Sequence, residues 1–200
     1  MESNNKAPLK IVFFSALPPF RGGISSFSKF LVNALKSKVG IHAFTFKKQY
    51  PDFLFPGGTQ FETNQKDTFP RVVTSYNPFT YFRASRRLKA DQPNVFVANY
   101  WMPFFSPMYV FMAKQFSKSV CKVALIHNLT PHEKRFFDKK LNHWFVNNFD
   151  LFVVLSEKVR QDVLSYNPNA LCKVIGHPKY EQFGVKKDRQ THRANLGIDT

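Results

Sequence analysis

Residues 10–31 read KIVFFSALPPFRGGISSFSKFL, and this stretch carries the clearest signal of the fold. The apolar run 10–15 is typical of a strand that is buried on both faces. From Ile24 onward, apolar side chains recur every three or four residues, which predicts an amphipathic helix. Between the two, the prolines end the strand and the paired glycines let the backbone approach another group closely. The stretch therefore predicts a strand–turn–helix unit with an anion site at the N-terminus of its helix.

The rest of the chain repeats this alternation of short apolar runs and helical patterns. We expect further strands at 41–46, 71–75, 95–99, 122–127, 151–156 and 172–175, and further helices at 78–88, 108–116, 131–148 and 157–166. Nearly continuous apolar strands that alternate with helices indicate a parallel sheet covered by helices. The sequence therefore predicts an α/β fold, a Rossmann-like parallel β-sheet with helices on both faces.

Composition narrows the class of protein. The chain has 200 residues and two cysteines, Cys121 and Cys172, which we interpret as reduced core residues of a cytoplasmic protein. No signal peptide is visible at the polar N-terminus. The longest apolar runs, such as 151–155, fall well short of the about 18 residues that a membrane-spanning helix needs. We therefore expect one globular domain without a membrane span.

Charge is the strongest bulk signal. Twenty-nine Lys and Arg stand against 13 Asp and Glu, which gives a formal net charge of +16. Such a surface attracts nucleic acid, anionic lipid or phosphorylated substrates. In 79–89 and 134–145 basic residues alternate with aromatic ones, a pattern that suits an anionic membrane surface. The same pattern also fits a solvated helix face whose aromatic side chains enter the core, and no nucleic-acid-binding motif is present.

Unusual residues follow several predicted strands. In an open parallel sheet, ligands bind outside the carboxyl ends of the strands, so these residues should meet at one edge. They are Arg21, Gly22, Gly23, Trp101, His127 and His132. The glycine pair could also serve a tight turn, and His127 could be a hydrogen-bonded strand end. No metal site is expected, because the second His of an H-E-x-x-H motif is missing after His132.

At this point the chain resembles a known family. The order strand, P-P-x-x-G-G-I and amphipathic helix resembles the opening of retaining glycosyltransferases of family 4, which have the GT-B fold. The likeness continues through NYWMPFFSP, LIHNLTPHE, FDLFVVLSEKVRQDV, VIGHPKYEQFG and RANLGI, and it spans nearly all of residues 10–198. Each block alone is weak, but the five in this order are specific.

The resemblance implies an arrangement of domains. The family has two Rossmann-like domains, of which the N-terminal one mostly binds acceptor and the C-terminal one binds the sugar nucleotide. We expect a disordered N-terminus at 1–9, the acceptor-side domain at 10–185 and, at 186–200, a linker toward a C-terminal donor domain. The full-length protein would then be a hexosyltransferase, and this 200-residue chain alone would be inactive.

The resemblance also implies roles for individual residues. Gly22 and Gly23, with Arg21 beside them, would bind the donor diphosphate, and His127 would lie at the reacting sugar as the catalytic residue. Trp101 and His132 would line the acceptor side. The reaction would move a sugar from a nucleotide-sugar donor to a glycan or lipid-linked acceptor with retention, without a metal or other cofactor.

These roles set the expected surroundings of the protein. We expect it in the cytoplasm, in peripheral contact with the anionic inner face of a membrane, taking part in polysaccharide biosynthesis without binding nucleic acid. The alternative is a non-catalytic Rossmann-like module that binds anionic ligands, namely phosphorylated sugars, anionic lipid or nucleic acid.

Overall fold

The computed structural model describes residues 8–51, 59–62, 69–130, 136–177 and 188–197. Its strands are β1 (Lys10–Phe14), β2 (Gly40–Lys48), β3 (Arg71–Thr74), β4 (Val95–Tyr100), β5 (Cys121–Ile126), β6 (Leu151–Val154) and β7 (Cys172–Val174). Its helices are α1 (Gly23–Lys36), α2 (Phe79–Lys89), the 3-10 helix η2 (Pro103–Phe105), α3 (Ser106–Lys114), α4 (Asp138–Val146), α5 (Glu157–Tyr166) and α6 (Arg189–Asn195).

The seven strands form one parallel sheet in the order β3-β2-β1-β4-β5-β6-β7. The chain moves outward from β1 to β3 and then returns to the other side of β1, where β4 pairs with it. The sheet therefore has a switch point between β1 and β4. In such sheets the crevice outside the carboxyl ends at the switch point is the usual ligand site.

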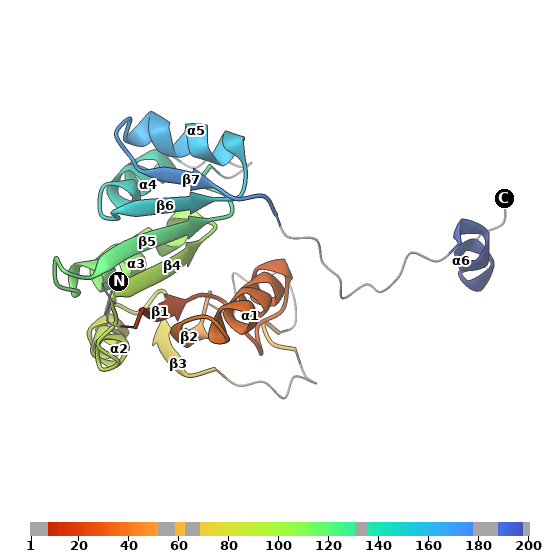
Figure 1. Cartoon of the computed structure of the whole chain (residues 1–200), viewed down its shortest axis with the longest axis horizontal. Helices are drawn as coiled ribbons and strands as arrows, with labels where there is room; N and C mark the ends of the chain where they lie inside the picture. Colours follow the sequence, from red (N-terminus) through yellow and green to blue (C-terminus); the bar gives the residue numbers. More distant parts are fainter. Residues whose placement is uncertain (1–7, 52–58, 63–68, 131–135, 178–187, 198–200) are drawn as a thin grey trace, which may run out of the picture.

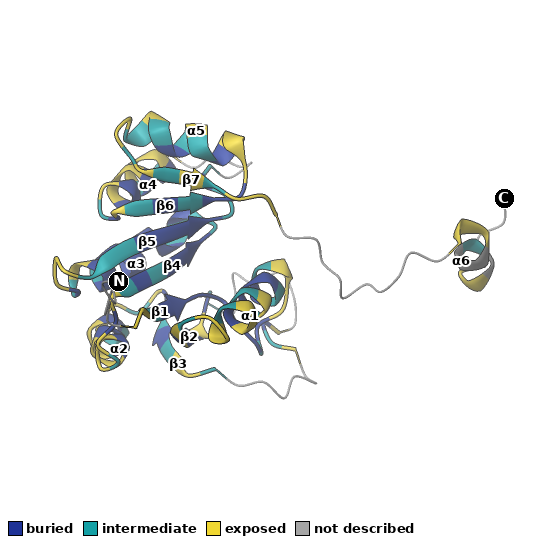
Figure 2. Cartoon of the chain, in the orientation of Figure 1, coloured by how far each residue is buried: buried dark blue, intermediate teal, exposed yellow. Residues whose placement is uncertain are grey.

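Helices cover both faces of the sheet, as the sequence predicts, but unequally. On one face, Phe27 and Val32 of α1 pack with Phe13 of β1 and Ile41 of β2. On the other face, side chains of α2, α3, α4 and α5 join a larger core cluster. Figure 1 shows α1 in front of the sheet and α3 and α4 behind it. Burial is deepest in the central strands β4 and β5, whereas β7 at the edge is more exposed (Figure 2).

The larger cluster is rich in aromatic rings. Phe14 on β1 is fully buried and makes edge-to-face contacts with Phe46 at 4.8 Å and Tyr109 at 5.8 Å between ring centroids. Tyr100 on β4 stacks on Phe145 of α4 at 3.9 Å. Rings of this kind bury large apolar areas and prefer such geometries. The many phenylalanines therefore fix how the helices lie on this face.

Several predicted boundaries differ from the structure. The sequence predicts one helix at 131–148, but residues 136 and 137 form a turn and α4 begins only at Asp138; residues 131–135 lie outside the described ranges. The third predicted helix begins and ends two residues earlier than expected, as α3. Within 186–200 the structure describes the helix α6, and the linker role of this stretch stays a prediction. Among the described helices, none combines the length and apolar character that crossing a membrane requires.

We predict that Phe14→Ala lowers the free energy of unfolding by about 3–5 kcal/mol, because it removes a ring from the middle of the core and leaves a cavity. Urea denaturation followed by circular dichroism measures this change. Phe79→Ala is the matched control, since Phe79 is 96% exposed and its loss should change stability by less than about 0.5 kcal/mol. Equal effects of the two substitutions would contradict this description of the core.

Candidate functional site

The turn between β1 and α1 presents bare backbone at the switch point. Gly22 has φ 105°, a left-handed conformation that favours glycine, and Gly23 is the first residue of α1. A Cβ atom added at either glycine would meet nothing within 4 Å. No side chain caps this helix, and no acidic residue lies in its first turn. Its first N–H groups and the positive end of its dipole can therefore receive an anion.

Contacts with a distant segment hold this turn in place. The Arg21 N–H donates to the Gln60 carbonyl at 3.1 Å, and Phe20 forms an isolated β-bridge with Phe61. The Phe20 ring is buried and lies 4.9 Å from that of Phe61. The side chain of Arg21 itself is exposed. An exposed guanidinium beside the helix N-terminus suits a phosphate ligand, as the sequence predicts.

A buried polar cluster joins α1 to the ends of β1 and β4. The Asn99 amide donates to the hydroxyls of Ser15 at 2.8 Å and Ser28 at 2.9 Å, and these two hydroxyls are 2.7 Å apart. All three side chains are fully buried. Asn99 Oδ1 and the hydroxyl of Ser25 are also buried but have no hydrogen-bond partner among the described residues. Such unpaired buried atoms are rare and call for a physical explanation.

His127 lies directly after β5, where its N–H donates to the Tyr100 carbonyl at 2.9 Å. Its ring meets Phe27 of α1 edge-on at 4.6 Å and lies 6.0 Å from the ring of His177. Since Phe27 is four residues after Gly23, His127 lies against the first turns of α1. Burial, and to a smaller degree His177, lowers the pKa of His127 to about 4, so the ring is neutral near pH 7.

The His127 ring is only partly exposed, because it packs on Phe27. Its Nε2 atom is buried without a hydrogen-bond partner among the described residues. A buried ring nitrogen without a partner loses hydrogen-bond energy. A ligand group at this position could supply the missing partner.

Trp101 follows β4 and belongs to an aromatic group with Tyr50. Its indole N–H donates to the Tyr50 hydroxyl at 3.4 Å, and that hydroxyl lies 3.1 Å from the sulfur of Met102. The Trp101 ring also packs 4.8 Å from Phe105. Burial raises the pKa of Tyr50, while the bond from Trp101 lowers it slightly. Trp101 is thus half-buried and held by neighbours, with a partly exposed ring at the carboxyl edge.

The structure brings His127 next to α1, whose first turn carries Gly22 and Gly23, whereas the contacts of Trp101 are with the Tyr50 group. His132 lies outside the described residues. Sequence reasoning missed Ser25, Asn99 and Tyr50. Ser25 lies in the first turn of a predicted helix and Asn99 at the end of a predicted strand. The alternation of strands and helices could therefore have pointed to both residues. Tyr50 could not, because it reaches Trp101 from a loop 51 residues away.

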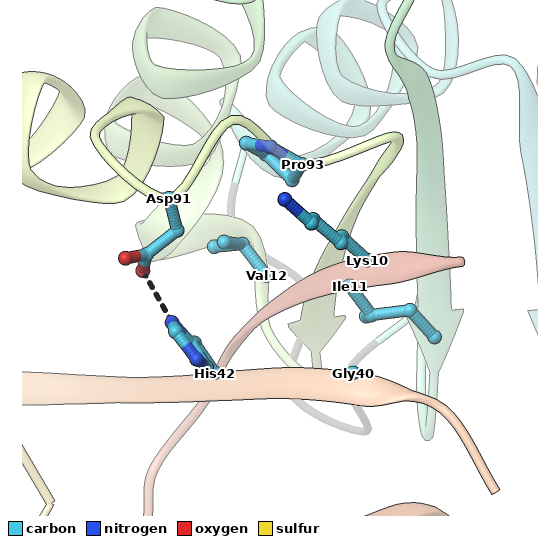
Figure 3. A pocket seen from close by; sticks show the side chains of 7 residues that line it. All are labelled: Lys10, Ile11, Val12, Gly40, His42, Asp91 and Pro93. Carbon is cyan, nitrogen blue, oxygen red and sulfur yellow. Dashed lines mark ion pairs between the residues drawn. The ribbon is translucent and has the colours of Figure 1, made fainter. Parts of the chain in front are cut away.

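A separate hollow lies at the opposite edge of the sheet, between the starts of β1, β2 and β4. It measures about 180 Å³ and is lined by Lys10, Ile11, Val12, Gly40, His42, Asp91 and Pro93 (Figure 3). His42 Nδ1 and the Asp91 carboxylate are 2.9 Å apart across it. Because this edge carries the amino ends of the strands, the hollow is separate from the glycine turn and His127.

A family model described as Glycosyltransferase Family 4 matches residues 21–178. A comparison with curated protein sequences gives no significant match.

Solved structures share the fold at low identity. An α-glucosyltransferase in complex with UDP and a 13-mer DNA containing an HMU base is 13% identical, with a TM-score of 0.58, over 86% of this chain and 43% of that chain. The same kind of enzyme with UDP and DNA containing an A:G mismatch is 15% identical, with a TM-score of 0.52, over 82% and 40%. Sucrose-phosphate synthase from Thermosynechococcus elongatus is 13% identical, with a TM-score of 0.51, over 94% and 99%. This chain thus spans less than half of the α-glucosyltransferase chains.

We predict that His127 stays neutral down to about pH 4, which makes stability depend on pH. Because its pKa falls from 6.5 to about 4 on folding, the unfolded chain binds a proton that the folded chain does not. The free energy of unfolding should therefore decrease as pH falls from 6.5 toward 4, by up to about 3 kcal/mol from this group. Urea unfolding at several pH values measures the slope.

His127→Gln is the matched control, because it keeps a polar side chain but cannot take up the proton. Its stability should decrease less between pH 6.5 and 4 than that of the unsubstituted chain. An NMR titration of the ring protons gives an independent reading. A midpoint near 6.5 would show that the ring is not shielded as described.

Proposed function

The chain belongs to glycosyltransferase family 4, and we propose that it forms the acceptor-side N-terminal half of an enzyme that transfers a sugar with retention from a nucleotide-sugar donor. The family match carries this proposal. It covers residues 21–178, and so includes Gly22, Gly23, Trp101 and His127 together with every strand after β1. Residues beyond these 200 would complete the donor site, in keeping with the share of the α-glucosyltransferase chains that this chain spans.

The glycine turn suits the donor diphosphate. As the bond to the sugar breaks, negative charge gathers on the leaving diphosphate, and preorganised N–H groups at that position stabilise it. Gly22 and Gly23 leave the start of α1 open, and Arg21 adds an exposed positive charge. The similar α-glucosyltransferase was solved with UDP, which supports a nucleotide diphosphate as the leaving group here. We propose that this stabilisation needs no metal ion.

His127 suits a role as a hydrogen-bonding group at the reacting sugar. Because its pKa is about 4, the ring is a neutral donor or acceptor and adds no positive charge near the oxocarbenium-like sugar. Its buried Nε2 has no partner among the described residues, so a sugar hydroxyl would satisfy it. A bond that shortens as the transition state forms contributes more to rate than to ground-state binding.

The aromatic group around Trp101 suits the acceptor. Its half-buried ring, held by Tyr50 and Phe105, offers a flat apolar surface beside the site. Apolar sugar faces and lipid-linked sugars both bind to such surfaces. We propose a glycan or a lipid-linked sugar as acceptor.

A donor screen tests this function. The protein, together with its donor-side residues, is incubated with a panel of nucleotide sugars and candidate acceptors while nucleotide release is measured. We expect one donor to be turned over and His127→Ala to lower its rate about 30- to 1000-fold, as loss of about 2–4 kcal/mol of transition-state stabilisation implies.

Structural damage must be separated from loss of chemistry in His127→Ala. The substitution also removes a ring that packs on Phe27, so its melting temperature and nucleotide affinity are measured on the same preparation. His127→Gln preserves more of the volume and serves as the control for packing. Near-normal rates in the folded fraction, with only a lower melting temperature, would overturn the proposed role.

We predict that Gly23→Ala separates binding from stability. Its Cβ would meet no protein atom within 4 Å, so the folded chain should tolerate it and gain up to about 1 kcal/mol from reduced freedom of the unfolded chain. The same methyl group would obstruct a diphosphate at the helix start and weaken nucleotide binding about tenfold or more. Thermal melts and nucleotide titration measure the two effects.

Gly22→Ala is the contrasting variant. At φ 105° an alanine is strained, so this change should destabilise the fold by about 1–3 kcal/mol. If Gly23→Ala bound nucleotide normally, the diphosphate would not lie on this turn.

A further inference from the structure

The outer face of α2 combines exposed phenylalanines with basic side chains. Phe79 is 96% exposed and Phe82 is 57% exposed. The exposed basic residues of the helix are Arg83, Arg86, Arg87 and Lys89, and the helix contains no acidic residue. Its inner face buries Tyr81, Ala84, Ser85 and Leu88. The sequence left open whether these aromatic side chains enter the core; Phe79 and Phe82 do not.

A small hollow lies beside Phe79, where β2 and β3 meet the start of α2. It measures about 180 Å³ and is lined by Lys47, Val72, Phe79, Thr80 and Arg83. The Thr80 hydroxyl is already occupied by bonds to the Thr74 and Asn77 carbonyls. Two cations therefore supply the polar character of the hollow. Within the described ranges, no carboxylate forms an ion pair with either Lys47 or Arg83.

Two cations that line one hollow, neither in an ion pair with a described carboxylate, attract an anion. A phosphate in the hollow would interact favourably with both charges. Arg and Lys are also the side chains that bind phosphate best. The start of α2 contributes little, because the Phe79 N–H already donates to the Asn77 side chain at 3.1 Å. The binding capacity therefore comes from the Lys47 and Arg83 side chains.

The hollow lies at the carboxyl edge of the sheet, which is also the edge of the glycine turn and His127. β2 ends at Lys48 and β3 at Thr74, and α2 begins directly afterward. A second very exposed ring, Phe136 at 93%, comes just before α4 at the same edge, and the exposed Lys139 and Lys140 follow it. Exposed rings with basic neighbours thus lie at the starts of both α2 and α4, along this edge.

We propose that the hollow between Lys47 and Arg83 binds the phosphate of an anionic lipid headgroup while Phe79 inserts into the membrane interface beside it. Charge alone would serve any polyanion, but a ring that is 96% exposed gains most from an apolar phase. Basic helices with protruding aromatic side chains lie in this way at the boundary between headgroups and acyl chains. The contact turns the carboxyl edge toward the lipid surface, where a lipid-linked acceptor would be presented.

Vesicle binding tests the proposal without any sugar transfer, so its outcome is separate from that of the proposed function. The 200-residue chain is sedimented with phosphatidylcholine vesicles, with and without phosphatidylglycerol. We expect binding only with phosphatidylglycerol. Each basic residue at an anionic surface is worth about 1 kcal/mol, so Lys47→Gln/Arg83→Gln should weaken the partition coefficient about 25- to 30-fold.

Matched controls remove the same kind of group elsewhere. Lys158→Gln/Lys173→Gln removes two exposed charges from α5 and β7, and its effect should be much smaller. Phe79→Ser should weaken binding about tenfold, as burial of an apolar ring implies. Leu171→Ser, at a residue that is 68% exposed near β7, should leave binding unchanged. The fluorescence of Phe79→Trp should shift to shorter wavelength on phosphatidylglycerol vesicles if the ring enters the interface.

Other occupants give different results. Equal weakening by the two charge pairs would show a general electrostatic effect and overturn the site. A rise in the melting temperature of the chain with inorganic phosphate alone, without binding to vesicles, would assign the hollow to a soluble phosphate compound. Tight, salt-dependent binding of oligonucleotides that Lys47→Gln/Arg83→Gln abolishes, without vesicle binding, would assign it to nucleic acid. Each of the last two results would overturn the lipid proposal.

Discussion

The hydrogen bonds that the buried Asn99 amide donates to Ser15 and Ser28 hold the centre of this fold. They join Asn99 near the end of β4 to Ser15, the residue after β1, and to Ser28 in α1, across 84 and 71 residues of sequence. Losing one partner would leave a buried polar group unpaired, at a cost of about 1–3 kcal/mol. Because α1 is the helix that carries the open glycine turn, this cluster also sets where the bare N–H groups point. The direction of these N–H groups thus depends on a polar contact inside the core.

The neutrality of His127 follows from the same packing. Docking of α1 places Phe27 against the imidazole, and this apolar contact, with the surrounding burial, disfavours the charged form. A histidine on a solvated strand end would be partly protonated near pH 6.5. The chain therefore obtains a neutral hydrogen-bonding group beside a helix N-terminus, where positive potential also disfavours a proton. Positive charge at this edge comes instead from arginine and lysine side chains.

Local patterns predicted the sheet and most helices because each element is specified by its own residues. The helix Glu157–Tyr166 matches its prediction to the residue, since Ser156 caps it through the Val159 N–H at 3.3 Å. The start of α4 was misplaced, because apolar Phe136 and Phe137 continue a helical pattern that the chain does not follow. The ligand site at the carboxyl edge stays a prediction, and it follows from topology alone. Contacts such as Gln60 with Arg21 have no local signal, because they join a loop to a turn 39 residues away.

The two edges of the sheet differ in how far their polar groups are satisfied. At the amino edge, Lys10 and Asn94 exchange bonds at 2.8 and 2.9 Å, and Lys122 and Asp150 do so at 2.7 and 2.8 Å. Asp91 Oδ2 there lies 2.9 Å from His42 Nδ1, although it is buried and makes no hydrogen bond among the described residues. At the carboxyl edge three buried atoms lack a hydrogen-bond partner among the described residues, namely the Ser25 hydroxyl, Asn99 Oδ1 and His127 Nε2. Folding alone gains nothing from leaving these atoms unpaired, and the proposed ligands at this edge would offer them partners.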